Sequence, residues 1–141
     1  MKNLLAAIFL SILCVAPGYA QSYTEIVWTQ IQNSFESASS DGYAMKNYII
    51  GAIGEDEDNT WTFYLDSSNE YLIRGFCDED CNDLDLYLRD NSGEELDSDI
   101  EDDDFPLMYF SPTSSNRYQI EISMYSCSVE PCYFGLAIFE K

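Results

Sequence analysis

The sequence contains no histidine and only six lysine and arginine residues, against 26 aspartate and glutamate residues. Without histidine, Ser–His–Asp triads and most general-base arrangements cannot be built. The formal net charge of −20 at pH 7 repels nucleic acids and anionic membrane surfaces. We therefore expect no nucleic-acid partner, and the charge favours cations, basic partners or solubility alone.

Long hydrophobic runs are also scarce, and the longest, Leu4–Val15, is shorter than the about 20 residues of a membrane span. Lys2 precedes this run, and small residues, Gly18 and Ala20, lie at positions −3 and −1 of a cleavage site. The pattern predicts a signal peptide, residues 1–20, and an exported chain in the periplasm or outside the cell. A lipoprotein signal acylated at Cys14 is the alternative, which the bulky Leu13 before it disfavours.

Cysteine is infrequent, and the predicted cleavage leaves four: Cys77, Cys81, Cys127 and Cys132. An even number in an exported chain predicts two disulfides, with three possible pairings. Local closure, Cys77–Cys81 and Cys127–Cys132, is favoured because each pair brackets a short polar turn and would clamp a hairpin. Zinc is disfavoured by the missing histidine and by spacings that differ from C-x₂-C.

The first segment of the expected mature chain, residues 21–42, has helical periodicity. Ser22 and Glu25 form a capping-box pattern, and the apolar residues Ile26, Val27, Trp28, Ile31 and Phe35 follow it. We predict an amphipathic helix from Tyr23 to Ala38, ended by the loop signal Ser39–Gly42. Its apolar stripe is expected to pack on the domain that follows; binding to a partner is the alternative.

From residue 43 to residue 141 the apolar periodicity changes to two. Alternation is clear around Trp61–Leu65, Leu84–Leu88 and Tyr118–Met124, and four further segments are strand-like: Lys46–Ile53, Glu70–Phe76, Leu107–Phe110 and Tyr133–Phe139. Such alternation is typical of half-buried antiparallel strands. Turn signals separate the segments, including the acidic run Asp97–Asp104. The pattern predicts an all-β domain, a sandwich or small barrel of seven or eight strands, preceded by one short helix.

Several of these segments resemble a known family. They are Tyr71–Phe76, Asp83–Asp90, Gly93, Asp99, Asp104-Phe105-Pro106 and Tyr118–Ile122. In this order they resemble the bacterial pre-peptidase C-terminal domain over about residues 45 to 139. The resemblance implies a jelly-roll-like antiparallel β-sandwich without catalytic activity, and the two cysteine turns resemble those of a stand-alone exported subgroup. A peptidase domain does not precede the module here, so a role beside a protease is not expected to carry over.

Aspartates concentrate in two predicted turns, and calcium prefers several oxygen ligands, including carboxylates. Asp83 and Asp85 share one face of a strand because successive side chains alternate. If the two turns meet at one end of the sandwich, these residues with Asp99 and Asp104 could form a calcium site. The alternative is that these carboxylates only cap turns, and the chain has no EF-hand spacing.

Three tyrosines, Tyr64, Tyr87 and Tyr125, fall on the outward phase of predicted strands. Aromatic faces stack on sugar rings and hold extended peptides, so these residues are candidate ligand contacts for an extracellular glycan or protein. The alternative is the ordinary preference of tyrosine for strands.

These patterns together predict an exported, monomeric, non-catalytic module with a binding or accessory role. A calcium-stabilised carbohydrate- or protein-binding domain is the form to test first. A structural or envelope-maintenance protein without a small ligand is the alternative, and a carboxylate-based hydrolase is a more remote one.

Overall fold

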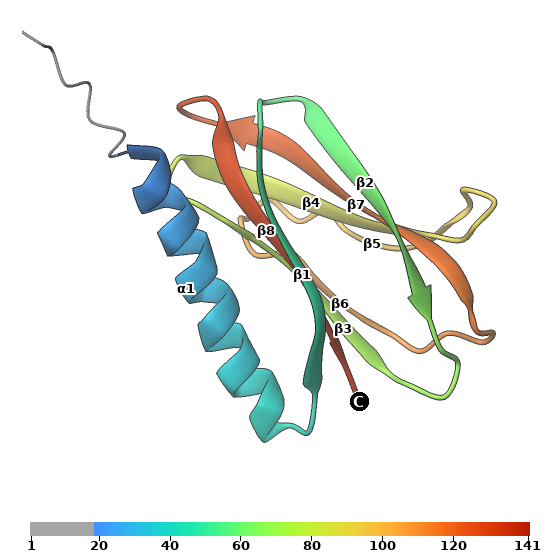
Figure 1. Ribbon diagram of the computed structural model, residues 1–141. Helices are drawn as coiled ribbons and strands as arrows, with labels where there is room; N and C mark the ends of the chain where they lie inside the picture. The colour runs from blue at the N-terminus through green and yellow to red at the C-terminus, as the bar shows by residue number, and fades with distance from the viewer. Residues whose placement is uncertain (1–18) are drawn as a thin grey trace, which may run out of the picture.

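One helix precedes eight strands in the computed structural model, which describes residues 19–141 (Figure 1). The elements are α1 (Tyr19–Ser40), β1 (Ala44–Ile53), β2 (Glu57–Leu65), β3 (Tyr71–Cys77), β4 (Cys81–Arg89), β5 (Glu95–Asp99), β6 (Leu107–Phe110), β7 (Asn116–Cys127) and β8 (Cys132–Glu140). The predicted signal peptide, residues 1–20, lies outside the described residues except for Tyr19 and Ala20, which begin α1. Within residues 19–141, no helix has the length and apolar character that a membrane crossing requires.

The strands form two four-stranded antiparallel sheets, with strand orders β1-β8-β3-β6 and β2-β7-β4-β5. The first strand pairs with the last, and the second pairs with the seventh, which is the jelly-roll arrangement. The predicted fold class, a jelly-roll-like sandwich after one helix, is confirmed.

Most connections cross from one sheet to the other. Among the described strands, only β4 and β5 are both consecutive in sequence and paired. Their turn is closed by Asp90, whose carbonyl accepts a hydrogen bond from the amide of Gly93 at a φ of 90°. The cysteine loops join β3 to β4 and β7 to β8, which belong to different sheets. The prediction that these loops close hairpins is therefore wrong.

The main core fills the space between the two sheets. The alternation predicted from the sequence buries Leu84, Leu86 and Leu88 of β4 completely, and Ile120, Ile122 and Met124 of β7 lie opposite. Aromatic side chains from the other sheet complete this core, including Tyr71 and Phe134. The intervening residues of β4 and β7 face outward, and they carry the site described below.

Helix α1 packs on the outer face of the β1-β8-β3-β6 sheet (Figure 1). It runs four residues further towards the N-terminus than predicted, so Ser22 lies inside the helix and not ahead of it. Val27, Ile31 and Ala38 form the buried stripe. Phe35, expected in that stripe, is 40% exposed, and the adjacent Ser34 is buried instead, where it accepts a hydrogen bond from Arg74.

Strand β5 was not predicted, because its residues lie partly in an acidic run that reads as a turn. Its side chains are exposed or half-buried, so no apolar alternation marks it. Backbone pairing with β4 defines the strand, with Asp99 opposite Leu86 and Asp97 opposite Leu88.

Candidate functional site

The two outer faces of the sandwich differ in what covers them. Helix α1 covers the sheet that contains β8, and the outer face of the β2-β7-β4-β5 sheet lies on the far side of the molecule from it (Figure 1). We call this second surface the open face. All three tyrosines predicted as ligand contacts are on strands of this sheet, at positions that alternate with its buried residues.

The three tyrosines do not share one site. Tyr64 is 58% exposed and lies opposite Arg117, near the start of β7. Tyr125 is 64% exposed and lies eight residues further along β7, roughly 27 Å away along the strand. Tyr87 pairs with Glu121 between them and is half-buried, with the Arg89 guanidinium 5.0 Å from its ring centre. Tyr87 and Tyr125 belong to one depression, and Tyr64 lies outside it.

This depression has a volume of about 480 Å³, and its lining residues are Asp83, Asp85, Tyr87, Ile100, Asp102 and Tyr125. We call it the acidic depression. Three lining residues come from alternate positions of β4, and Tyr125 comes from β7. Ile100 and Asp102 follow the end of β5. The β4–β7 pairing shifts on either side of Asp83, so that Tyr125 is an extra, bulged residue between Met124 and Ser126. Bulges redirect side chains, and this one places a tyrosine at the depression.

The two β4 carboxylates of the acidic depression are both buried. Asp83 is 8% exposed, and its Oδ1 atom has no hydrogen-bond partner in the described part of the chain. Burial raises the pKa of Asp83, and repulsion from Asp85, Asp102 and Asp103 raises it further. Burial also raises the pKa of Asp85, against the hydrogen bond that it accepts from the Tyr87 hydroxyl at 3.2 Å. No cationic side chain belongs to the described lining of the depression, so the carboxylates face it without a counter-charge.

The predicted calcium set is divided by the structure. Asp99 lies opposite Leu86 and therefore on the core side of the sheet, whereas Asp83 and Asp85 face outward. The Asp99 carboxylate accepts hydrogen bonds from the amides of Leu107 and Glu101, and the half-buried Asp104 lies in the following loop. Within residues 19–141, no group of three or more carboxylate, cysteine or histidine residues is placed to hold a metal ion. Asp83 and Asp85 therefore line the acidic depression together, whereas Asp99 and Asp104 do not line it. Burial raises the pKa of Asp85, and Asp99 still lies near enough for its negative charge to raise that pKa further.

The two disulfides lie beside the acidic depression. They are the local pairs Cys77–Cys81 and Cys127–Cys132, each with a Cα separation of 5.9 Å. Cys81 and Cys127 are register partners, so the two bonds lie side by side at one end of the sandwich. The amide of Ser128 donates to the carbonyl of Asp80 at 2.7 Å and joins the loops directly. Asp83 and Tyr125 each lie two residues from a cross-linked cysteine, so the disulfides hold both strands at the depression.

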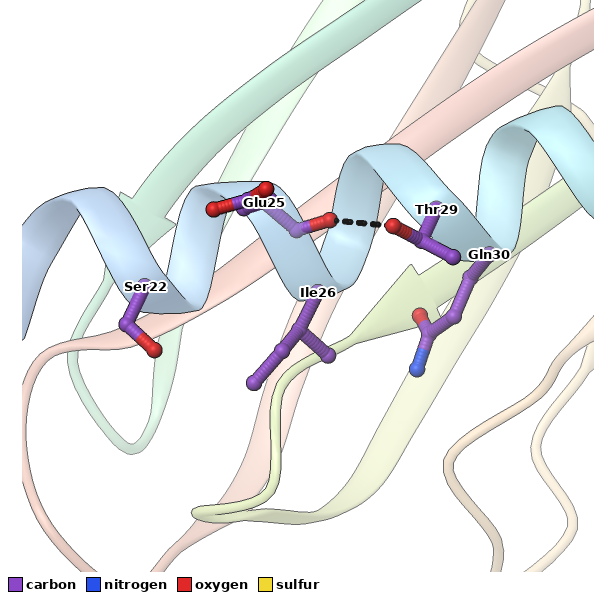
Figure 2. Close-up of a pocket in the computed structure, with 5 residues that line it drawn as sticks. All are labelled: Ser22, Glu25, Ile26, Thr29 and Gln30. Carbon is purple, nitrogen blue, oxygen red and sulfur yellow. Dashed lines mark hydrogen bonds between the residues drawn. The ribbon is translucent and has the colours of Figure 1, made fainter.

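A second hollow lies on α1 and is shown in Figure 2. It is lined by Ser22, Glu25, Ile26, Thr29 and Gln30, all from one helix. The Thr29 hydroxyl donates to the Glu25 carbonyl at 2.8 Å, and the Gln30 amide donates to the carbonyl of Cys77 at 3.0 Å. The Gln30 amide nitrogen attaches the helix to β3, whereas its Oε1 atom has no hydrogen-bond partner among the described residues. All five lining residues lie on a single helix, with no second element to enclose a ligand, so we assign none to this hollow.

Sequence reasoning did not single out two lining residues, Ile100 and Asp102. Both lie beyond β5 in the acidic run, which the sequence marks only as a turn. Recognising them requires the β4–β5 register, since the position opposite Asp85 falls on Ile100 when that register is extended. The bulge at Tyr125 likewise leaves no sequence signal.

A scan against protein-family models finds no match, and a search of curated proteins finds no relative. A search of solved structures finds the pre-peptidase C-terminal domain of a collagenase from Bacillus anthracis, with a TM-score of 0.53 and 15% sequence identity. The match covers 67% of this chain and 89% of that one. At this identity the likeness shows the fold, and the resemblance predicted from the sequence is confirmed at that level.

Proposed function

We propose that this chain, which has the fold of a pre-peptidase C-terminal domain, is an exported, non-catalytic module that binds a ligand at the acidic depression. One observation carries the proposal. Two buried carboxylates and two tyrosine rings line a single cavity on the sheet face opposite α1. Concave sites with aromatic walls and a few convergent polar groups are the usual form of ligand sites.

The composition of the chain supports a non-catalytic role. The sequence has no histidine, and the four cysteines of the described residues are in disulfides. The disulfides and the predicted signal peptide support export, because disulfides persist in oxidising compartments.

The test is binding to an array of glycans and extracellular matrix proteins, with the protein purified from the exported fraction. We expect a saturable ligand of the wild-type protein whose binding is weakened about threefold or more by Tyr125→Ala. Tyr109→Ala is the matched control, because Tyr109 is 61% exposed on β6 of the other sheet. Equal loss in both variants would contradict the proposed site. Turnover of glycosidase or esterase substrates that Asp83→Asn abolishes would contradict the non-catalytic role.

Calcium at Asp83 and Asp85 is an alternative occupant of the acidic depression. It is what remains of the predicted set, because Asp99 and Asp104 do not line this depression. Thermal melts in millimolar calcium and in chelator decide whether calcium binds at this site. A higher melting temperature in calcium that Asp85→Asn removes would support this occupant. Equal melting temperatures in the two buffers would exclude it.

A further inference from the structure

We propose that the acidic depression binds the cationic side chain of a lysine or arginine in a basic polypeptide. This inference rests on the proposed function, since it names the ligand of the same site.

The first argument is the unpartnered carboxylate of Asp83. The side chain lines the cavity with 8% of its surface exposed, and no described group donates a hydrogen bond to its Oδ1 atom. A carboxylate taken out of water is costly unless a cation or donor compensates it. The neighbouring Asp85 already accepts a hydrogen bond from the Tyr87 hydroxyl, and its negative charge repels that of Asp83. A protonated ligand nitrogen would supply the missing donor and the missing positive charge together.

The second argument is the aromatic and apolar part of the lining. Tyr87, Tyr125 and Ile100 share the cavity with the carboxylates. A lysine or arginine has an aliphatic stem that packs on apolar surface and a charged head that reaches polar groups, which matches this lining. Organic cations are also attracted to the faces of aromatic rings. The molecule already uses such pairs, since Lys141 lies over Tyr43 at 5.4 Å and Lys46 over Tyr71 at 5.6 Å.

The lining also distinguishes an organic cation from a metal ion. Calcium takes six to eight oxygen ligands at short distances. The acidic depression offers two buried carboxylates and the exposed Asp102, and the remaining lining residues are two tyrosines and an isoleucine. Its volume of about 480 Å³ accommodates a long side chain, and a bare ion would leave most of it unfilled.

The net charge of the whole chain favours the same class of partner, a basic polypeptide. At a net charge of −20, long-range attraction raises the encounter rate with basic polypeptides and opposes encounter with nucleic acids. Among the described residues, Arg89 is the only arginine that lies against a tyrosine of the lining, Tyr87. The carboxylate of Glu121, 2.7 Å from the guanidinium, neutralises its charge. Arg89 therefore does not compensate Asp83.

The experiment measures binding of an octalysine peptide to the full exported protein by calorimetry at 0.15 M salt. The control ligand is the same peptide acetylated at every lysine Nζ, which keeps the stems and removes the charges. We expect saturable binding of octalysine, with no binding of the acetylated peptide. We expect Asp83→Asn to weaken octalysine binding about tenfold and Tyr125→Ala to weaken it about threefold.

The matched control is Asp41→Asn, which removes one carboxylate charge from an exposed position after the C-terminal end of α1. We expect it to change the affinity less than about twofold, as for an exposed charge. Equal weakening by Asp41→Asn and Asp83→Asn would show diffuse attraction and overturn the inference. Equal binding of the acetylated peptide would also overturn it.

Failure of the inference and failure of the proposed function give different results. If octalysine does not bind but an array ligand binds in a Tyr125-dependent way, the inference fails and the proposed function stands. If calcium binds in an Asp83-dependent way and octalysine does not, the occupant is a metal and the inference again fails. If no ligand of any kind depends on Tyr125 or Asp83, both fail.

Discussion

Asp78 and Asp83 are buried aspartates five residues apart with opposite surroundings. Asp78 is 2% exposed, and its carboxylate accepts hydrogen bonds from the amides of Asp80 and Cys81 in its own loop and of Tyr133 on β8. It therefore ties the first disulfide loop to β8, the neighbour of β3 in the same sheet. Asp83 is almost as buried, yet its Oδ1 atom has no partner among the described residues. The hydrogen bonds of Asp78 stabilise the fold, whereas the buried, unpartnered carboxylate of Asp83 destabilises it.

This destabilisation predicts that Asp83→Asn stabilises the protein at neutral pH. The change removes a buried, uncompensated charge, and we expect the free energy of unfolding at pH 7 to rise by roughly 0.5–1 kcal/mol, a small value because the depression opens to water and screens the charge. Since folding raises the pKa of Asp83, the folded state favours the protonated form. The wild type therefore loses stability as the pH rises through that pKa, and the variant does not.

Urea unfolding from pH 3 to pH 7 measures this effect. The advantage of Asp83→Asn should be largest at pH 7 and fall towards zero at about pH 3, where the carboxyl is mostly protonated in both the folded and unfolded chains. Asp102→Asn is the control, because Asp102 lines the same depression but is exposed. A variant less stable than the wild type at pH 7 would mean that Asp83 has a favourable partner in the folded protein.

At the scale of elements, α1 sits close to its sheet because β8 has a glycine beneath it. A Cβ atom placed on Gly135 would lie 2.7 Å from Cγ1 of Val27 and 3.0 Å from Cδ1 of Ile31. Those two residues are fully buried and form the centre of the helix stripe. Gly135 thus sets the distance between the helix and the sheet.

Gly135→Ala should therefore destabilise the protein by about 1–3 kcal/mol, the usual cost of overpacking a buried contact. Adding Val27→Ala to this variant should recover part of the loss, because it removes the atom nearest to the new methyl group. Urea unfolding of the two single variants and the double variant gives the coupling energy. Gly54→Ala is the control, since its new methyl group would meet nothing nearer than 3.4 Å. Simple additivity of the Gly135 and Val27 changes would contradict the proposed contact.

Strand β4 shows how much of an element the sequence predicts. The alternation of Leu84, Leu86 and Leu88 with polar residues predicts which side faces the core, and the structure confirms it. The same alternation places Asp83 and Asp85 on one face, as predicted. It does not specify the neighbouring strand, so it could not reveal that Ile100 and Asp102 complete the depression.

At the scale of the whole molecule, the jelly-roll topology brings distant segments to one end of the sandwich. The two disulfide loops are joined by Ser128 and Asp80, and the acidic depression begins two residues from Cys81 and Cys127. Local cross-links of four and five residues thereby brace a site built from strands that are far apart in sequence.

Export is the prediction that belongs to this scale. When the chain is expressed with its own N-terminus, we expect N-terminal sequencing of the exported protein to begin at Gln21, because the signal pattern ends at Ala20. Intact mass spectrometry should give a mass lower by four hydrogens than that of the reduced chain, for the two disulfides. Retention of Met1 or four free thiols would contradict the prediction.

By itself the sequence determined the class of fold and the face on which Asp83, Asp85, Tyr87 and Tyr125 lie, and it favoured the local disulfide pairing over two others. These features depend on short-range periodicity and on small loop closures, which are written in consecutive residues. Only the tertiary structure decided that Asp99 turns to the core side, that Tyr64 lies far from Tyr125 and that α1 leaves the site uncovered. These outcomes depend on strand order, register and a bulge, which arise from packing between residues distant in the chain.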